Sequence, residues 1–592
     1  MPTSQRQEHA PPNFGVVREV SRKLLFALLD RISDSKTLIW DPDLMQPFDL
    51  ITGFRDLQEH QIEHMLPLKV GCAVPDPKQA VVVLVRPRLC HATAIASIVK
   101  GLVKLEKEFR CHLVLVPHRS VLLEHKLREL NVFDQLTSVE HLPLFFFTLD
   151  KDLISMELDA LPAILVDNDI RVVSTIAQAL LHLEDIFGTI GRIFCKGNIA
   201  DAVWHSWKKL RDGQKQREME PLINTVIIVD RVLDLVTPMV TQLSYEGLID
   251  EIYNIRCGSA KFPKANFTGE SGEASTADDY LKLALNSNDL LYSELRDLNF
   301  NAVGPALSKR IKSLSAQLDQ RHHATSIGEY RDFVKRLPTL QAERKSAATH
   351  TTIAEMVKEV ISTDMFIETL NCEQAFLNCI ETHSVNSWIL SCIHRNVPLR
   401  QVLRLMCLQS LVSGGLKRKI FDQYRKELVQ QYGYQHLVTL RRLEKAGLLK
   451  GSGGHDAKAQ SRLYSNICRS FTLIREEINE LKPEDISYVY SGFAPLIARL
   501  CQHVVKPGWR NITEHLEKIP GEMKIIDKFD EGLPATGEKV LLVFFVGGVT
   551  SAEVSALRFL SSQTGRTFIV ATTSVITGSR LLDAFLETGA IR

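Results

Sequence analysis

The sequence lacks any apolar run long enough to cross a membrane. One of its longest, LLVFFVGGV at 541–549, falls far short of the roughly 20 residues that a spanning helix needs. The first residues, MPTSQRQEHAPPNFG, lack the apolar segment of a signal peptide. The 11 cysteines include no C-x-x-C pair, which argues against a structural zinc site and fits buried thiols in a reducing cytosol.

Net charge is almost absent as well. The 71 basic and 70 acidic residues leave a formal charge of +1. No sequence-wide field therefore draws the chain to nucleic acid or to an anionic membrane. We expect a cytoplasmic protein without a nucleic-acid partner.

The 592 residues are too many for one hydrophobic core and indicate three or four domains. Short apolar runs alternate with helical patterns in residues 14–145, 146–255 and 475–592, which predicts parallel sheets covered by helices on both faces. Because two C-terminal strands cannot bury both their faces alone, we expect 475–592 to join the sheet of 146–255. The predicted strands are 37–40, 80–85, 112–116, 142–147, 163–167, 225–229, 539–548 and 567–573.

Residues 256–474 have almost no strand signal. Helical patterns cover most of this stretch, so we predict a helical domain inserted into the second α/β domain, which makes the latter discontinuous. The fold class is thus α/β plus all-α. The predicted helices are 279–297, 302–319, 328–337, 351–380, 385–395, 398–412, 418–431 and 436–449.

Charged residues end the apolar strand at 225–229. Asp230, Arg231 and Asp234 follow it, and then Thr237 and Pro238. Arg231 can bridge both carboxylates, and Thr237 can cap a helix with Pro238 in its first turn. The functional alternative is a carboxylate pair at the carboxyl edge of a sheet, a common place for metal or acid–base chemistry. We favour a structural joint, with no catalytic or metal-binding residue.

A glycine turn follows the predicted strand at 539–548. Gly547 and Gly548 precede Thr550 and Glu553, which have the spacing of a capping box. A helix N-terminus after a glycine turn is also a candidate phosphate site. The turn lacks the lysine of a P-loop and the third glycine of a dinucleotide turn, and Glu553 is negative. We therefore predict a capped turn and no cofactor.

Residues 60–64, HQIEH, match the spacing of an inverted zincin with both imidazoles on one helical face. The same residues are typical of a solvated helix with Ile62 and Leu66 inward, which we favour. No G-x-S-x-G elbow occurs, and the cysteines and histidines show no spacing of a nucleophile and its base. The sequence specifies no reaction, which favours a binding protein.

The charged strand end is followed by SYEGL at 244–248. Together with six further segments, it forms a set of short motifs in a fixed order along the chain. The six segments are VRPRL at 85–89, LVPHRS at 115–120, DLISME at 152–157, YGYQHLVTLRRLEKAGLL at 432–449, YSGFAPLIARL at 490–500 and FVGGVTSAEVSALRFL at 545–560. In this order they resemble the Sec1/Munc18 family, most closely its Vps33 branch, over nearly the whole chain. Within that branch, IRCGSAKF at 255–262 and LRLMCLQS at 403–410 are more similar to the B-type than to the A-type.

The resemblance implies a three-domain arch without bond chemistry. Such proteins receive SNARE helices in a cleft between the first domain and the helical domain, and they template SNARE assembly for membrane fusion. The hairpin concerned corresponds to about 328–365. Here Ala347, Ala348 and Thr349 stand where bulkier apolar residues are expected. The resemblance also implies a tethering complex, peripherally bound to vesicles, late endosomes and lysosomes through its partners.

Vps33 proteins dock on a helical-repeat subunit, Vps16 for the A-type and its Vps16B/VIPAR relative for the B-type. Tyr434 and Leu437 match that surface, although the same residues fit a helix that faces its own core. Two further functions stay open. One is an adaptor with the fold but no SNARE activity, and the other is a nucleotide-dependent enzyme using the Asp230/Asp234 edge or the Gly547–Gly548 turn.

Overall fold

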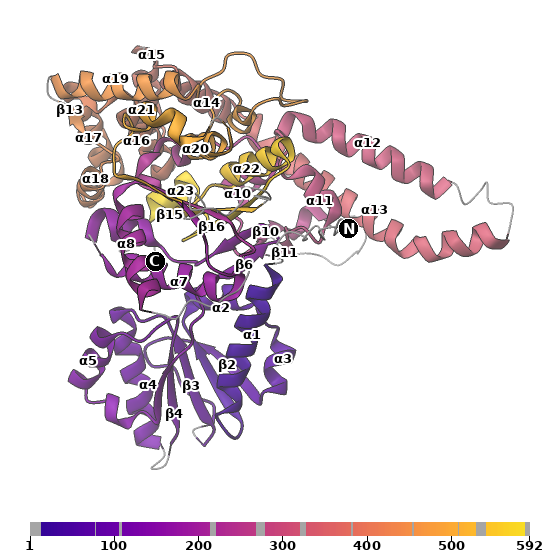
Figure 1. Ribbon diagram of the computed structural model, residues 1–592, viewed down its shortest axis with the longest axis vertical. Coiled ribbons are helices and arrows are strands. Elements are labelled where there is room, and N and C mark those ends of the chain that lie inside the picture. Colours follow the sequence, from indigo (N-terminus) through magenta and orange to yellow (C-terminus); the bar gives the residue numbers. More distant parts are fainter. Residues whose placement is uncertain are drawn as a thin grey trace, which may run out of the picture. The chain divides into compact units, whose positions relative to one another are not determined.

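The computed structural model describes residues 14–586 apart from 77, 106–108, 168, 214–220, 268–278, 320–326, 380–382, 453–454, 507 and 528–539. The described residues form two compact units, 14–157 and 158–586 (Figure 1). The first boundary thus lies after Glu157, later than the predicted 145. The division of residues 158–586 into a discontinuous α/β domain and a helical domain stays a prediction.

The first unit is built on a parallel five-stranded sheet with the order β2-β1-β3-β4-β5. Along β3, Val82 and Leu84 pack toward α1, α2 and α3, while Val81 and Val83 pack toward α4 and α5. Helices therefore cover both faces (Figure 1), as predicted. The elements are α1 Gly15–Asp30, β1 Lys36–Trp40, α2 Pro42–Phe48, α3 Phe54–Glu59, β2 Ile62–Pro67, β3 Ala80–Val85, η1 Leu89–His91, α4 Ala92–Leu105, β4 Cys111–Leu115, α5 Val121–Glu129, η2 Phe133–Gln135 and β5 Ser138–His141.

Two sequence predictions in this unit are wrong. The predicted helix through 60–64 is absent, because α3 ends at Glu59 and β2 pairs with β1 from Ile62 onward. His60 instead lies 2.6 Å from Asp30, and His64 is on the strand, so the zincin spacing brings no pair of imidazoles to one helical face. The apolar run at 142–147 gives only its last residue to a strand. That strand, β6 (Phe147–Asp150), pairs antiparallel with β7 (Leu153–Ser155).

In the second unit, adjacent strands run in the order β14-β8-β9-β15-β16. β8 (Arg192–Lys196), β9 (Thr225–Asp230), β15 (Val540–Val546) and β16 (Thr567–Thr572) are parallel, and β14 (Met523–Asp527) is antiparallel to β8. Strands that precede residue 256 and strands that follow residue 474 thus share one sheet. β9 pairs with β15 so that Asp230 lies opposite Val546. This register sets the candidate site.

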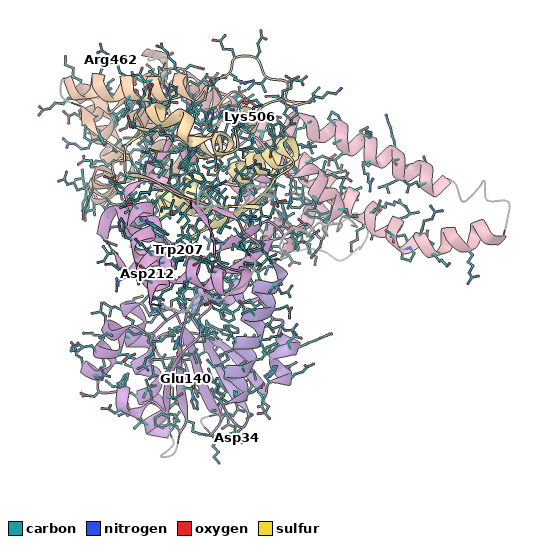
Figure 2. All side chains as sticks on the ribbon, viewed as in Figure 1. Asp34, Glu140, Trp207, Asp212, Arg462 and Lys506 are labelled. Carbon is teal, nitrogen blue, oxygen red and sulfur yellow. The ribbon has the colours of Figure 1, made fainter. Side chains whose placement is uncertain are left out.

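Helices surround these strands. They include α7 and α8, and Figure 2 labels Trp207 and Asp212 on α8. The predicted strand at 163–167 is wrong: Ala163–Asp167 form a single π-helical stretch after α6, because a short apolar run does not separate strand from helix. The elements are α6 Ala160–Pro162, α7 Arg171–Phe187, α8 Asn198–Asp212, η4 Arg231–Leu233, α9 Val236–Met239, α10 Tyr245–Tyr253, η7 Ile486–Tyr490, α20 Leu496–Val505, η8 Trp509–Ile512, α21 Thr513–Leu516, α22 Ser551–Thr564 and α23 Gly578–Asp583.

The part between 256 and 474 is mainly helical, as predicted. Its α12 and α13 run side by side and extend away from the rest of the unit (Figure 1). The elements are β10 Ser259–Pro263, η5 Lys264–Phe267, β11 Tyr280–Ala284, α11 Leu290–Leu295, α12 Phe300–Asp319, α13 Ile327–Ile361, α14 Asp364–Leu377, α15 His383–His394, α16 Leu399–Ser413, β12 Leu416–Lys417, α17 Arg418–Tyr432, α18 His436–Lys445, β13 Gly451–Ser452 and α19 His455–Ser470.

Three details of this part differ from the predictions. The antiparallel pair β10–β11 was missed. The predicted helix 279–297 is wrong over its first part, because residues 280–284 form β11 and only 290–295 are helical, as α11. The predicted helices 328–337 and 351–380 are instead one helix, α13, followed by α14, and Pro338 lies inside α13 without ending it. In the described residues, none of the helices is both long and apolar enough to span a bilayer.

Candidate functional site

The charged strand end and the glycine turn, separate in the sequence, meet in the structure. Arg231 is fully buried, and its Nη1 donates to both carboxylate oxygens of Glu553 at 2.9 and 2.8 Å. Its Nη2 lies 3.5 Å from Asp234 Oδ2, and its Nε donates to the Asp234 carbonyl at 2.9 Å. One guanidinium thus joins the end of β9 to the first turn of α22. We name Asp230, Arg231, Asp234 and Glu553 the charged joint.

The strand register explains this meeting. Because Asp230 pairs with Val546, the next residues, Arg231 and Gly547, lie side by side. A Cβ on Gly547 would come within 2.8 Å of Arg231 Cβ, and φ is +105° there. Glycine is needed at this position for the close approach and for the positive φ. The close approach of Arg231 therefore explains why glycine stands in this turn. A bound phosphate is not needed to explain it.

Glu553 fills the helix N-terminus where a phosphate would bind. It completes the predicted capping box, because Glu553 N–H donates to Thr550 Oγ1 and Thr550 N–H donates to the Glu553 carboxylate at 2.9 Å. Burial and the nearby Asp234 raise the pKa of Glu553, while Arg231 lowers it. Burial lowers the pKa of Arg231, but Glu553 and Asp234 outweigh it and raise that pKa. The short contacts of Arg231 Nη1 with both Glu553 oxygens, at 2.9 and 2.8 Å, support an ion pair.

The N-cap position of α9 is Leu235, and the side chain that accepts an N–H of its first turn is that of Asp234 rather than Thr237. The Asp234 carboxylate accepts from Thr237 N–H at 2.9 Å and from the Thr237 hydroxyl, and it also accepts from Leu496 N–H at 3.1 Å. Thr237 and Pro238 lie inside α9, so the prediction that Thr237 is the cap is wrong. A capping residue precedes the first turn, whereas Thr237 is the second residue of the helix. A single carboxylate therefore begins both α9 and α20.

Asp230 takes a different part from the one expected. Its carboxylate accepts from the backbone N–H groups of Ile199 and Val232 at 3.1 and 3.2 Å. Arg231 bridges Asp234 and Glu553 rather than Asp230 and Asp234, since β9 points the Asp230 side chain toward α8. Burial raises the pKa of Asp230, against the bonds from these two N–H groups.

The joint offers no access to a substrate. Asp230, Asp234 and Glu553 are 3%, 4% and 0% exposed, and each carboxylate is held by the hydrogen bonds given above. In the ranges that the structure describes, no group of three or more His, Cys, Asp and Glu side chains could hold a metal ion. The geometry thus favours the structural interpretation of these residues over the catalytic one.

Tyr434 and Leu437 lie on the solvent side of their segment. Tyr434 precedes α18 and is 80% exposed, and Leu437 is 45% exposed. The residues of α18 that face the core are Thr439, Leu440 and Leu443, so the alternative in which Tyr434 and Leu437 face their own core is wrong. Beside them is a groove of about 690 Å³, lined by Leu437, Val438, Arg441, Arg442, Glu444 and Lys445.

The small residues in the hairpin have a local explanation. Ala347 is buried in the core that α13 forms with α10, α11 and α12, whereas Ala348 is exposed. A bulkier side chain at 347 would overfill this contact. Of the two alanines, Ala348 is the one whose side chain is exposed to solvent.

The two units have mainly parallel sheets covered by helices, and the sequence identifies the family that they belong to. The Sec1 family matches residues 36–584; the chain belongs to this family.

Within it, the chain is 41% identical to vacuolar protein sorting-associated protein 33A of Rattus norvegicus, over 97% of this chain and 98% of that protein. It is 33% identical to the Arabidopsis thaliana vacuolar protein-sorting-associated protein 33 homolog, over 98% of each. It is 30% identical to protein 33B of Mus musculus, over 97% and 98%. The Vps33 resemblance is confirmed. Identity is higher with the rat A-type protein than with the mouse B-type protein, which does not support the B-type preference.

Solved structures agree on the fold. The SM protein Vps45 in complex with the Qa SNARE Tlg2 matches with a TM-score of 0.59 at 15% identity, over 96% of this chain and 97% of that one. The Unc18–syntaxin 1 complex from Monosiga brevicollis matches with a TM-score of 0.58 at 13% identity, over 96% and 98%. The predicted Sec1/Munc18-like fold class is confirmed.

Proposed function

We propose that this protein is a SNARE-binding subunit of a tethering complex in vesicle docking and fusion and in endosome-to-lysosome trafficking. It templates SNARE helices and makes or breaks no covalent bond. It acts in the cytoplasm, peripherally on vesicle, late-endosome and lysosome membranes, through its partners. The observation that carries the proposal is the α12–α13 hairpin in a chain of the Sec1 family.

The hairpin suits the binding of a helix. At 1.5 Å per residue, α13 spans roughly 50 Å, and Arg310 of α12 pairs with Glu343 of α13 at 3.1 Å. One side of the described part of α13 packs inward, and exposed positions such as Arg344, Lys345 and Ala348 lie elsewhere around it. A long, preformed helical surface lowers the entropy cost of ordering a partner helix. The buried positions are Leu340, Ala347, His350, Ile353, Met356 and Val357.

A kinetic assay tests templating. Soluble SNARE domains with fluorescent labels are mixed with and without the chain, and the assembly rate is measured. Ala348→Arg places a long charged side chain on the open surface of α13, so the acceleration should fall at least about fivefold, the size of a modest contact loss. Ala202→Arg is the matched control, since Ala202 is an exposed helical alanine on α8. A wild-type chain that leaves assembly unchanged would favour the adaptor instead.

We propose that a Vps16-like subunit, of the Vps16 or the Vps16B/VIPAR type, docks at Tyr434 and Leu437. Tyr434 is 80% exposed, and Leu437 lines a groove with Val438, three basic residues and Glu444. An exposed tyrosine is a common interface anchor. Tyr434→Asp should abolish co-purification with this subunit without lowering thermal stability. Val121→Asp in the first unit is the control, because Val121 is an equally exposed apolar residue at 79%. Unchanged co-purification of the Tyr434 variant would remove this residue from the interface.

A further inference from the structure

One carboxylate, that of Asp289, forms hydrogen bonds with two helices, α11 and α13. Asp289 is the N-cap of α11 and accepts from the N–H groups of Leu291 and Tyr292 at 3.0 and 3.1 Å. The same carboxylate accepts from the Ser346 hydroxyl of α13 at 2.9 and 2.7 Å. It also lies 3.3 Å from His350 Nε2, one turn further along α13. Asp289 therefore begins α11 and binds α13 at two points.

His350 extends this contact to a third helix. It is 2% exposed, and its Nδ1 lies 3.1 Å from the hydroxyl of Tyr245 on α10. Its ring stacks on that of Tyr292, with centroids 5.7 Å apart and planes at 17°. The Tyr245 hydroxyl also donates to the His350 carbonyl at 3.3 Å. The polar atoms of α13 thus meet partners on α10 and at the start of α11.

A long helix needs such contacts to fix its register. The neighbouring contacts of α13, through Ala347, Ile353 and Val357, are apolar and non-directional. A shift of one residue moves a helix by about 1.5 Å and turns each side chain by about 100°. Apolar packing tolerates such a change better than hydrogen bonds do, because hydrogen bonds require defined distances and angles. Buried polar groups can set register in this way.

We propose that Asp289, Ser346 and His350 form a register lock that fixes which face of α13 is presented to a SNARE helix. The three residues are positioning residues and do not themselves touch the SNARE. The lock rests on the proposed function for its purpose, but its effect on α13 can be measured without any SNARE. Loss of the lock lets the part of α13 around Ser346 and His350 separate from the start of α11 and shift along its axis. The fraction of molecules that can bind a SNARE helix then falls.

The charge on Asp289 agrees with this arrangement. Burial alone would raise the pKa of Asp289. The hydrogen bonds from His350, Ser346 and the Tyr292 N–H outweigh burial and hold the pKa of that carboxyl well below its ordinary range. The carboxylate is therefore ionised at neutral pH, where it is the stronger acceptor.

The decisive variants change one hydroxyl on α13. Ser346→Ala removes the donor to Asp289, and Ser346→Thr restores a hydroxyl at the same place. Thr352→Ala is the matched control, because the Thr352 hydroxyl donates only within α13, to the Ala348 carbonyl at 3.2 Å. Hydrogen–deuterium exchange of the α13 amides is measured on the full-length chain, with thermal stability and acceleration of SNARE assembly as further readouts.

Ser346→Ala should speed exchange at residues 343–353 about fivefold, the effect of one lost hydrogen bond, and should slow SNARE assembly by a similar factor. Ser346→Thr and Thr352→Ala should match the wild type. Equal exchange in Ser346→Ala and wild type would overturn the lock, as would faster exchange with unchanged templating. A wild-type chain without templating activity removes the proposed function and with it the purpose of the lock, while the exchange result still decides whether the lock holds α13.

Discussion

Arg231 lies between the Glu553 and Asp234 carboxylates, and none of its side chain reaches solvent. Removing one partner of a buried ion pair typically costs about 3–5 kcal/mol when the other charge is left unpaired. Glu553→Gln keeps the capping-box geometry but removes the charge, and it leaves Asp234, 3.5 Å away, as the partner of Arg231. We expect this variant to lose roughly 2 kcal/mol of unfolding free energy, less than a fully unpaired ion would cost. The check is urea unfolding followed by tryptophan fluorescence, to which the buried Trp207 contributes.

The double variant Arg231→Met with Glu553→Gln tests what Arg231 does for Asp234. It leaves the buried Asp234 carboxylate without its cation, although Asp234 keeps its bonds from Thr237 and Leu496. The double variant should therefore be less stable than Glu553→Gln alone. A double variant as stable as Glu553→Gln would mean that Asp234 gains nothing from Arg231, and the ion-pair account would be wrong.

Asp485 makes stability depend on pH. Burial would raise the pKa of Asp485, but two hydrogen bonds from the Arg499 guanidinium, at 2.8 and 2.9 Å, lower it to about 2. A carboxyl whose folded pKa is depressed stabilises the protein above its unfolded pKa of 3.8, and this is lost as pH falls toward the folded value. After a discount for solvent screening, the contribution is roughly 1 to 2 kcal/mol.

Asp485→Asn should therefore be less stable than the wild type at pH 7, and the difference should shrink between about pH 4 and about pH 2. Asparagine can still accept from Ser487 N–H as the cap of η7, so the charge alone is tested. Urea midpoints of both proteins across this range give the result. A difference that stays constant down to pH 2 would show that Arg499 does not stabilise the ionised form.

The sequence was sufficient to mark Asp230, Arg231 and Asp234 as a charged group at a strand end. It was not sufficient to pair Arg231 with Glu553, 322 residues away along the chain. That pairing follows from the alignment of Asp230 with Val546 in adjacent strands, and a parallel register is set by tertiary packing rather than by either strand. Asp289 was missed for the same reason, because its partners on α13 are far along the chain.

At the scale of elements, the turn between β15 and α22 is tightly constrained. Gly547 has φ of +105° and would place a Cβ 2.8 Å from Arg231, whereas Gly565, after α22, has φ of +66° and open space around it. Gly565→Ala should cost about 1 kcal/mol for backbone strain alone. Gly547→Ala should cost at least about twice as much, because its φ lies outside the left-handed α region and its new Cβ would also overlap with Arg231.

Thermal unfolding of the two glycine variants gives this comparison directly. Equal losses would mean that Arg231 moves aside at little cost and that the turn only requires a positive φ. A larger loss in Gly565→Ala would contradict the role of close approach altogether.

Helices with clear periodicity were predictable as elements, and α12, α16 and α17 match their predicted ranges closely. Short apolar runs were not. AILVD at 163–167 became a π-helical stretch, because five apolar residues satisfy either conformation and neighbouring packing decides. The strand β14 was missed since its alternating MKIID is short and follows polar residues. Its strand conformation depends on antiparallel pairing with β8.

At the scale of the whole molecule, the two units differ in how the chain builds them. Residues 14–157 contain a complete parallel sheet with an apolar cluster on each face. Residues 158–474 contain β8 and β9, but not β15, β16 or Glu553, which lie beyond the helical part. A fragment of 14–157 should therefore fold alone with a cooperative thermal transition, while a fragment of 158–474 should aggregate or remain unfolded.

The reason for the second expectation is that β9 is fully buried and would lose its neighbour β15, which exposes apolar surface and leaves Arg231 without Glu553. The fragment 158–592 is the control, since it restores both. Circular dichroism melts and size-exclusion chromatography of the three fragments test this. A soluble 158–474 fragment that unfolds cooperatively would mean that the helical part and the β8–β9 pair are stable without the C-terminal strands, and that the shared sheet is not what joins the two halves of the chain.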